Sequence, residues 1–164
     1  MEMMFWLACL YVWAWMTIWW VVSIWLHNVS IVDIIYSLNF AIITGLYLTE
    51  IPQIDLSIAC FSVAIFLWAT RLFSHLLYRN WGCGEDKRYQ RFRENYGKER
   101  YWWFSYFQVF ILQGAFLLIF ASPIHISYYT PLNNPIYPLA ILGFLLFIFG
   151  FLYETIADLQ LYRF

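Results

Sequence analysis

The apolar character of this chain is plain in its opening stretch, residues 3–26, which reads MMFWLACLYVWAWMTIWWVVSIWL. Only Thr17 and Ser23 interrupt it with small polar side chains. About 20 apolar residues in a helix cross the hydrocarbon core of a bilayer, and a backbone inside lipid must satisfy its own hydrogen bonds. The stretch therefore predicts a transmembrane helix. It is preceded by Glu2 and by no Lys or Arg, and no small-residue cleavage site follows it, so we expect this helix to be retained.

Four further apolar runs follow, and each is long enough to span a membrane as a helix. They cover residues 31–49, 54–78, 104–122 and 136–161. Ser122-Pro123 is expected to end the fourth span, and Gln113-Gly114 inside it to let neighbouring helices approach closely. The sequence thus predicts an all-α integral membrane protein, a bundle of about five transmembrane helices that forms one domain over residues 1–164.

The composition supports this class and excludes others. The 164 residues are 63% hydrophobic and 12% charged, whereas soluble domains average roughly 45–50% and 25%. The net charge is −1, which provides no field for holding a polyanion, so we expect no nucleic-acid partner. The three Cys form no CxxC pair and the three His lie in separate segments, so we expect no metal.

Basic residues indicate the orientation of the chain. Seven of the nine Lys and Arg lie between Arg79 and Arg100. The positive-inside rule therefore places the loop 79–103 in the cytoplasm, the N-terminus outside and the C-terminus inside. We expect the inner membrane of a bacterium.

The loop 79–103 also predicts a short helix in the membrane interface. Tyr89, Phe92 and Tyr96 recur at helical spacing among basic residues. Glu85 and Asp86 suit the positive end of this helix, and Gly97 suits its C-terminus. Two interpretations stay open: a surface helix that orients the protein, or a helix whose arginines bind phosphate.

Ionisable residues inside the predicted spans gather near their cytoplasmic ends. Counted inward from that interface at 1.5 Å per residue, Arg71 and Glu154 lie at similar depth, and so do His75 and Asp158. Asp33 also lies at the expected cytoplasmic end of its helix. Charges within a membrane are costly and need partners. The residue types fit equally a buried ion pair that sets the register of the bundle and a functional site.

Several ordered motifs carry a resemblance to a known family. They are RNWGCGEDKRY at residues 79–89, preceded by Arg71-Leu72; SIVD at residues 30–33; the Ser, Phe, Val-Phe and Gln-Gly positions within residues 105–114; and the closing Gly-Phe, Glu and Asp-Leu-Gln positions within residues 150–160. Together the chain resembles bacterial membrane proteins of the steroid 5-alpha-reductase-like superfamily, in a largely uncharacterised branch.

The resemblance implies a reductase that uses NADPH to reduce a C=C bond conjugated to a carbonyl, in a sterol-like or other lipid. It implies that Glu154 and Asp158 contact the cofactor, with Arg71 near it; Glu154 stands where the steroid enzymes have Asn. The acid that polarises the substrate carbonyl has no match by motif, and Asp33 and Tyr78 are candidates by depth alone.

The chain departs from the family in one respect. Members continue with a Ser-Arg-His-Pro-Asn-Tyr-like segment that completes the cofactor pocket, and this sequence stops at Phe164 without it. We therefore expect the front part of such a reductase: either a truncated or frameshifted product, a part of a longer chain, or one half of a split protein whose partner is a missing C-terminal half. The alternative is a non-catalytic membrane bundle, either a gene relic or a protein that binds a lipid or a partner.

Overall fold

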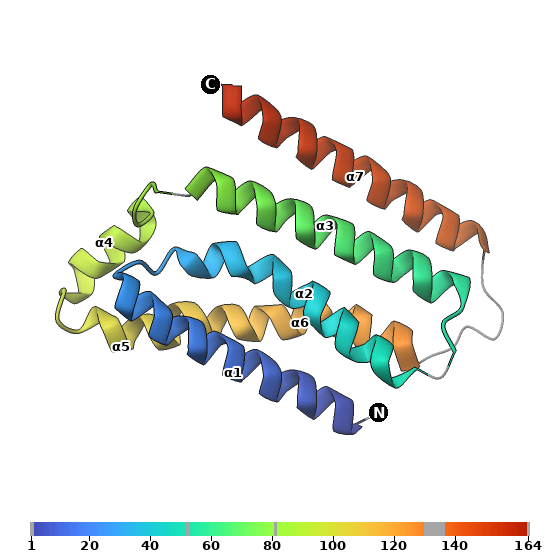
Figure 1. Ribbon diagram of the computed structural model, residues 1–164, viewed down its shortest axis with the longest axis horizontal. Helices are drawn as coiled ribbons and strands as arrows, with labels where there is room; N and C mark the ends of the chain where they lie inside the picture. Colours follow the sequence, from blue (N-terminus) through green and yellow to red (C-terminus); the bar gives the residue numbers. More distant parts are fainter. Residues whose placement is uncertain (1, 52, 81, 130–136, 164) are drawn as a thin grey trace. The chain divides into compact units, whose positions relative to one another are not determined.

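The computed structural model describes residues 2–51, 53–80, 82–129 and 137–163, and every element in these ranges is helical (Figure 1). The elements are α1 (Glu2–Leu26), α2 (Ile31–Glu50), α3 (Leu56–Asn80), α4 (Lys87–Tyr96), α5 (Tyr101–Ser105), the π-helix η1 (Tyr106–Ile111), α6 (Leu112–Tyr129) and α7 (Tyr137–Arg163). Five helical stretches are long and apolar enough to cross a membrane, with α5, η1 and α6 forming one of them. The expected all-α class with about five spans is confirmed.

The chain forms two compact units, residues 1–129 and residues 130–164. Helix α7 is the described part of the second unit. In the first unit α2 is central, because it packs against α1, α3 and α6. The single domain that the sequence predicts over residues 1–164 stays a prediction.

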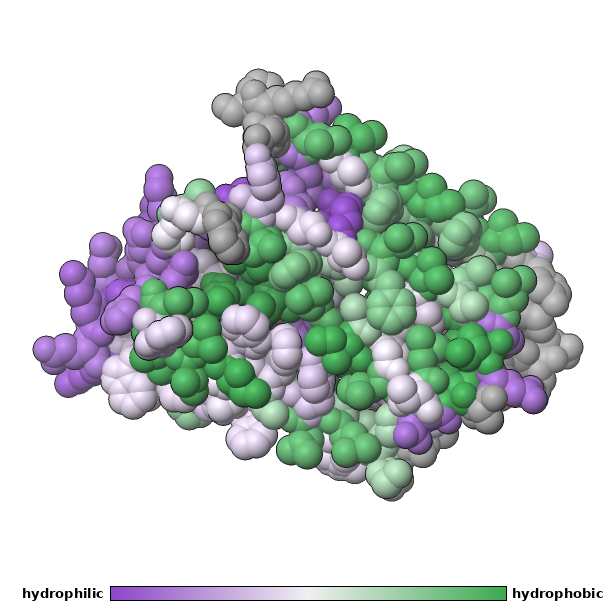
Figure 2. All heavy atoms as spheres, viewed as in Figure 1, coloured by the Kyte–Doolittle hydropathy of each residue, from purple (hydrophilic) through white to green (hydrophobic). Residues whose placement is uncertain are grey.

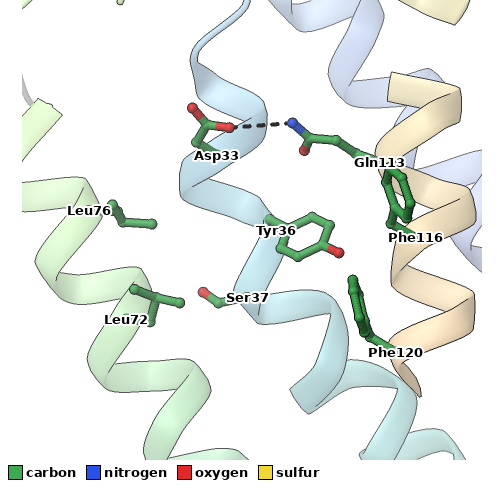
Figure 3. Close-up of a pocket in the computed structure, with 8 residues that line it drawn as sticks. All are labelled: Asp33, Tyr36, Ser37, Leu72, Leu76, Gln113, Phe116 and Phe120. Atoms are coloured by element: carbon green, nitrogen blue, oxygen red, sulfur yellow. Dashed lines mark hydrogen bonds between the residues drawn. The ribbon is translucent and has the colours of Figure 1, made fainter. Parts of the chain in front are cut away.

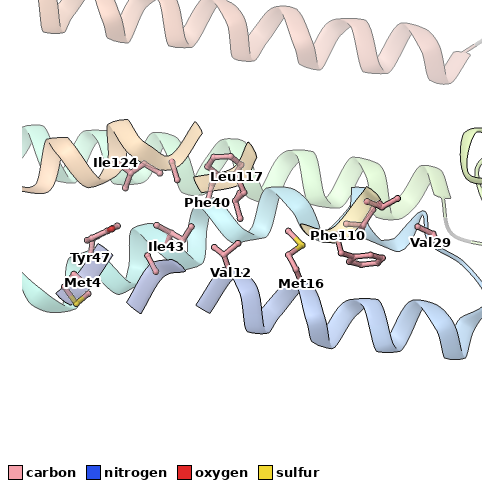
Figure 4. Packing of buried hydrophobic residues seen from close by; sticks show 14 of the residues in the cluster. Met4, Val12, Met16, Val29, Phe40, Ile43, Tyr47, Phe110, Leu117 and Ile124 are labelled. Carbon is pink, nitrogen blue, oxygen red and sulfur yellow. The ribbon is translucent and has the colours of Figure 1, made fainter. Parts of the chain in front are cut away.

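The core of the first unit lies between α1, α2 and the α5–η1–α6 stretch (Figure 4). Val12, Met16, Ile43, Phe110 and Leu117 are almost fully buried there. Many large apolar side chains of the same helices point outward instead, and such a surface is stable only against lipid. Gly114 marks the close approach expected of the Gln-Gly pair: a Cβ added there would meet the side chains of Met16 and Val12 at 3.4 Å.

The fourth span is longer than predicted and continues through Pro123, so the expected end at Ser122-Pro123 is wrong. Proline has no N–H, so the carbonyl of Ile119 loses its usual helical donor. The hydroxyl of Ser122 donates to this same carbonyl at 2.7 Å. In transmembrane helices such side-chain bonds let a proline sit inside the helix, and the span accordingly runs from Tyr101 to Tyr129.

A π-helix lies within the same span. Over Tyr106–Ile111 the backbone bonds widen by one residue, and the N–H of Leu112 reaches the carbonyl of Phe107. The phenol of Tyr106 fixes this turn against α1, because its oxygen accepts from the Trp13 indole at 3.1 Å and lies 3.1 Å from the Thr17 hydroxyl. Short π-helical turns are often found at functional sites.

The short helix of the third-to-fourth connection is present as α4. Asp86 caps its N-terminus and accepts a hydrogen bond from the Arg88 backbone N–H at 2.8 Å. Gly97 ends it with a φ of +85°, a conformation that glycine adopts without strain. The aromatic stripe faces the protein: Tyr89 is buried, and Tyr96 stacks on Phe104 with ring centroids 4.0 Å apart. Hydrophilic residues gather at this end of the molecule, on the left in Figure 2.

Candidate functional site

Asp33 is the centre of a polar network at the α4 end of the first unit. It lies in the first turn of α2, where the helix dipole favours a carboxylate. One carboxylate oxygen accepts from Arg88 at 3.0 Å. The other accepts from the phenol of Tyr89 at 2.9 Å and, at 3.4 Å, from the amide of Gln113. Three elements, α2, α4 and α6, therefore meet at this one carboxylate.

A second set of bonds holds the α1–α2 turn against the segment that leads into α4. The backbone N–H of Val29 donates to the Glu85 carboxylate at 2.9 Å, and the N–H of Asp86 donates to the Ser30 hydroxyl at 2.6 Å. Glu85 also accepts two bonds from Arg93, at 2.8 and 3.1 Å. The side chain of Glu85 is only 9% exposed, so its burial is balanced by these donors. The motif GED thus positions α4 rather than forming an open acidic surface.

The charges of α4 shift the pKa values of its own groups. The pKa of Asp86 lies below its usual range, chiefly because the Arg88 side chain donates to it. The pKa of Arg88 is raised, first by its bond to Asp86. Burial raises the pKa of Tyr89, and the negative charge of Asp33 raises it further. Tyr89 is therefore a phenol that donates to Asp33 throughout the physiological range.

Next to this network lies an open cavity of about 540 Å³, here called the Asp33 cavity. Its lining residues are Asp33, Tyr36, Ser37, Leu72, Leu76, Gln113, Phe116 and Phe120, from α2, α3 and α6 (Figure 3). Tyr36 points from α2 toward Phe116 and Phe120, while Ser37 points toward Leu72. The Ser37 hydroxyl is buried and has no hydrogen-bond partner within the described ranges. The cavity therefore has a polar end at α2 and apolar walls from α3 and α6.

The structure brings one of the predicted site residues, Asp33, into this cavity. Tyr78 lies on α3 with 67% of its surface exposed, and neither Tyr78 nor Arg71 lines the cavity. Glu154 and Asp158 lie on α7 in the second unit. The roles of these residues at a cofactor, and the pairing of Arg71 with Glu154, stay predictions.

Sequence reasoning did not single out Tyr36, Ser37 or Tyr89 as site residues. Tyr36 and Ser37 stand inside an apolar run and read as packing residues. Gln113 did carry a signal, because an amide within a span needs a partner. Its partners Asp33 and Tyr89 lie 80 and 24 residues away, and only the folded chain shows them.

The capacity of this region to hold a cofactor is limited. A dinucleotide carries phosphates that need cations or a helix N-terminus. The described residues lining the Asp33 cavity include no Lys or Arg. Asp33 is an acidic residue and offers no positive charge to a phosphate. The lining of the Asp33 cavity therefore does not fit the phosphates of NADPH. Within the described ranges, no three His, Cys, Asp or Glu side chains are grouped so as to hold a metal ion.

The fold and the cavity define a multi-pass helical membrane protein. Over residues 19–164 the chain matches DUF1295, a family described as proteins of unknown function, and it belongs to that family. The family is associated with steroid 5-alpha-reductase-like proteins, so the chain is a membrane protein of the steroid reductase-like type. Neither the curated proteins nor the solved structures contain a match to this chain.

Proposed function

We propose that this protein binds a sterol-like or other lipid in the Asp33 cavity and takes part in the NADPH-dependent reduction of a C=C bond conjugated to the carbonyl of that lipid. The association of the family with steroid 5-alpha-reductase-like proteins supports the reaction class. The observation that carries the proposal is the cavity itself, which places a few polar groups at one end of an otherwise apolar space of about 540 Å³. Its size is within the range of small-molecule sites, roughly 300–1,000 Å³.

The polar end suggests how the carbonyl is held. Asp33 already accepts from Arg88, Tyr89 and Gln113. Both of its carboxylate oxygens are therefore already engaged as acceptors within the protein. Tyr36 has a hydroxyl directed into the cavity. We therefore assign the polarising hydrogen bond to Tyr36, and a positioning role to Asp33.

A polarised carbonyl is the part of the reaction that these residues supply. A hydrogen bond from Tyr36 to the carbonyl oxygen draws electron density from the conjugated β-carbon and makes that carbon electrophilic. Leu72, Phe116 and Phe120 exclude water from the lipid body. NADPH would supply a hydride when bound, and the resemblance implies Arg71, Glu154 and Asp158 as its contacts.

The lipid site is tested with a radiolabelled steroid that carries a ketone conjugated to a C=C bond, and with the same skeleton lacking the ketone. Binding is measured by scintillation proximity on protein in detergent. Tyr36→Phe is expected to weaken binding of the ketone by roughly three- to tenfold, the value of one hydrogen bond, and to leave the ketone-free skeleton unaffected. Tyr96→Phe removes a hydroxyl from α4, outside the lining of the Asp33 cavity, and serves as the control. Equal losses for both ligands would refute the role of Tyr36.

The reductase part is tested separately with NADPH. Isothermal titration is expected to give binding that weakens in Arg71→Ala and Asp158→Ala, and absorbance at the NADPH band is expected to fall when the enone steroid is added. Steroid binding without any NADPH binding or consumption would refute the reductase and leave a non-catalytic lipid-binding bundle. No binding of either ligand would refute the whole proposal.

In the cell, we propose that the protein lies in a bacterial inner membrane with the α4 end in the cytoplasm. Seven of the nine basic residues lie at this end, as the positive-inside rule requires for a cytoplasmic face. The same orientation places the polar end of the Asp33 cavity near the compartment that holds NADPH.

A further inference from the structure

A second cavity, separate from the Asp33 cavity, lies among the ends of α1, α4 and α5. Its volume is about 260 Å³, and its polar lining includes His27, Arg93, Lys98 and Tyr101. These residues come from the end of α1, from α4, from the α4–α5 turn and from the start of α5. We call it the basic cavity. All four side chains carry hydrogen-bond donors, and two of them are permanently cationic at neutral pH.

Tyr101 gives the clearest sign that the basic cavity lacks a ligand group. The side chain is fully buried, with 0% of its surface exposed. Its hydroxyl has no hydrogen-bond partner among the residues that the structure describes. A buried polar atom without a partner destabilises the fold by an amount comparable to a lost hydrogen bond. Tyr101 is one of the residues that line the basic cavity, and an acceptor that reached its hydroxyl from there would satisfy it.

The charges around the cavity indicate the sign of that acceptor. Arg93 donates to Glu85 through Nε and Nη2, so its Nη1 lies outside this pair. The pair neutralises the guanidinium, and Lys98, which is exposed, leaves the lining with net positive charge. Over residues 79–100 the chain carries seven basic and four acidic side chains. The field at this end of the molecule therefore favours an anion.

Aromatic residues indicate that the basic cavity lies at the level of lipid headgroups. Trp102 lines it with half of its surface exposed, and the Trp20 indole donates to the Trp102 carbonyl at 2.8 Å. Trp25, at the end of α1, is 80% exposed. Tryptophans of this kind gather at the membrane–water interface, and basic pockets at the cytoplasmic ends of spans bind anionic headgroups.

We propose that the basic cavity binds a phosphoryl anion, held by Lys98, Arg93 and the hydroxyl of Tyr101. A phosphoryl group has several acceptor oxygens that point in different directions, which matches donors that converge from three elements. The anion comes either from the headgroup of an anionic phospholipid in the adjoining leaflet or from free phosphate. The two sources share this chemistry and differ in whether an acyl chain is needed.

The decisive variant is Tyr101→Phe, measured by thermal unfolding in a non-ionic detergent. Without an anion the melting temperature is expected to stay equal or to rise, because the variant deletes an unsatisfied hydroxyl and keeps the ring. With inorganic phosphate or phosphatidylglycerol the wild type is expected to melt higher, and Tyr101→Phe to lose most of this increase. A fall of the melting temperature without any anion would show instead that the hydroxyl serves the fold, and would overturn the proposal.

A matched pair of lysine variants tests the charge. Lys98→Gln is expected to weaken phosphate binding about tenfold, the usual effect of losing a charged hydrogen-bond donor. Lys87→Gln removes the same charge from the exposed start of α4, outside the cavity lining, and is expected to change binding little. Equal effects of the two variants would indicate general attraction of phosphate to a basic surface and would contradict a defined binding site.

The source of the anion follows from three additions at equal ionic strength: sodium phosphate, phosphatidylglycerol, and sodium chloride. Stabilisation by phosphatidylglycerol alone identifies a lipid headgroup, and stabilisation by both phosphates identifies a site for the phosphoryl group itself. Stabilisation by chloride to the same extent, or by none of the three, would overturn the proposal.

Discussion

Asp86 shows how one side chain of the GED motif organises its surroundings. Its carboxylate caps α4 by accepting from the Arg88 N–H at 2.8 Å, and it accepts from the Arg88 guanidinium at 3.1 Å. Its own N–H donates to the Ser30 hydroxyl. Asp86 therefore caps the N-terminus of α4 and also connects this helix to the start of α2.

The charge of Asp86 makes part of the stability dependent on pH. Arg88 lowers the pKa of this carboxyl below its ordinary value of 3.8. A lowered pKa in the folded state means that the stabilisation is complete above 3.8 and is lost as the pH falls through the folded-state pKa. Asp86→Asn keeps a good helix cap and removes the charge. We expect the variant to melt below the wild type at pH 7, and the difference to shrink and vanish as the pH falls through the folded-state pKa of Asp86.

The control for this pH profile is Glu94→Gln, which removes an exposed carboxylate from the same helix. It is expected to show a smaller difference at pH 7, because exposed ion pairs contribute little. A difference between Asp86→Asn and the wild type that stays constant from pH 7 to pH 3 would contradict the role of the charge.

Single residues were predictable from sequence only where their partners are local. The capping Asp86 and the terminating Gly97 act within a few positions of α4, and both predictions are confirmed. Asp33 was recognisable as a carboxylate at a helix start, but its donors Arg88 and Tyr89 lie 55 and 56 residues away. Spacing along the chain does not encode such contacts.

At the scale of an element, α6 depends on how Ser122 compensates for Pro123. The Ser122 hydroxyl donates to the Ile119 carbonyl, the one that loses its helical donor to the proline. Ser122→Ala is therefore expected to lower the free energy of unfolding by about 0.6–1.7 kcal/mol, the range for side-chain hydrogen bonds inside membranes. Chemical unfolding in mixed micelles, followed by circular dichroism, measures it.

Ser127 on the same helix provides the comparison. Its hydroxyl donates to the Ile124 carbonyl at 2.9 Å, but Tyr128 has an N–H that supplies the ordinary helical bond to that carbonyl. Ser127→Ala is accordingly expected to change stability much less. In a Pro123→Ala background the effect of Ser122→Ala should disappear, and a persistent effect there would argue against the compensation.

Among the elements, sequence analysis identified the spans by apolar length and α4 by aromatic spacing. It ended the fourth span too early because proline usually stops a helix in water. Inside lipid the alternative, an unsatisfied backbone, is worse, so the helix continues. The prediction was wrong because proline ends helices in water more readily than it ends helices in lipid.

At the scale of the whole molecule, the basic α4 end defines a testable orientation. Cys83 lies in the connection before α4 and is exposed. In a variant with Cys9→Ala and Cys60→Ala it is the single thiol. If the loop 79–103 faces the cytoplasm as proposed, a membrane-impermeant maleimide is expected to label Cys83 in inside-out vesicles and not in intact spheroplasts.

The matching variant moves the single thiol to the other end of the bundle. Gln53→Cys, combined with replacement of all three native Cys, places it in the connection between α2 and α3, where residue 53 is exposed. The labelling pattern is expected to reverse. Labelling of Cys83 from the periplasmic side would invert the proposed topology.

The scale of the molecule is also where sequence reasoning reached its limit. The number and class of the spans follow from composition, and both are confirmed. The predicted Arg71–Glu154 pair rests on equal depth in two helices of separate units. Similar depth says how far each side chain lies from the membrane surface. It does not say how far apart the two side chains lie within the membrane plane, so the pair needs a direct measurement.

The π-helix has a consequence for how this span is counted. Before Val109 the buried residues are Tyr101 and Ser105, and after Phe110 they are Gly114, Leu117, Ala121, Ile124 and Tyr128. On one uninterrupted α-helical wheel these two groups would lie roughly 160° apart. A π turn takes up one extra residue, or about 100°, and so brings both groups close to one face. The segment works as two α-helical stretches joined by this turn, and a single-residue deletion within 106–111 is expected to convert the turn into ordinary α-helix while keeping Gln113 on the face toward Asp33.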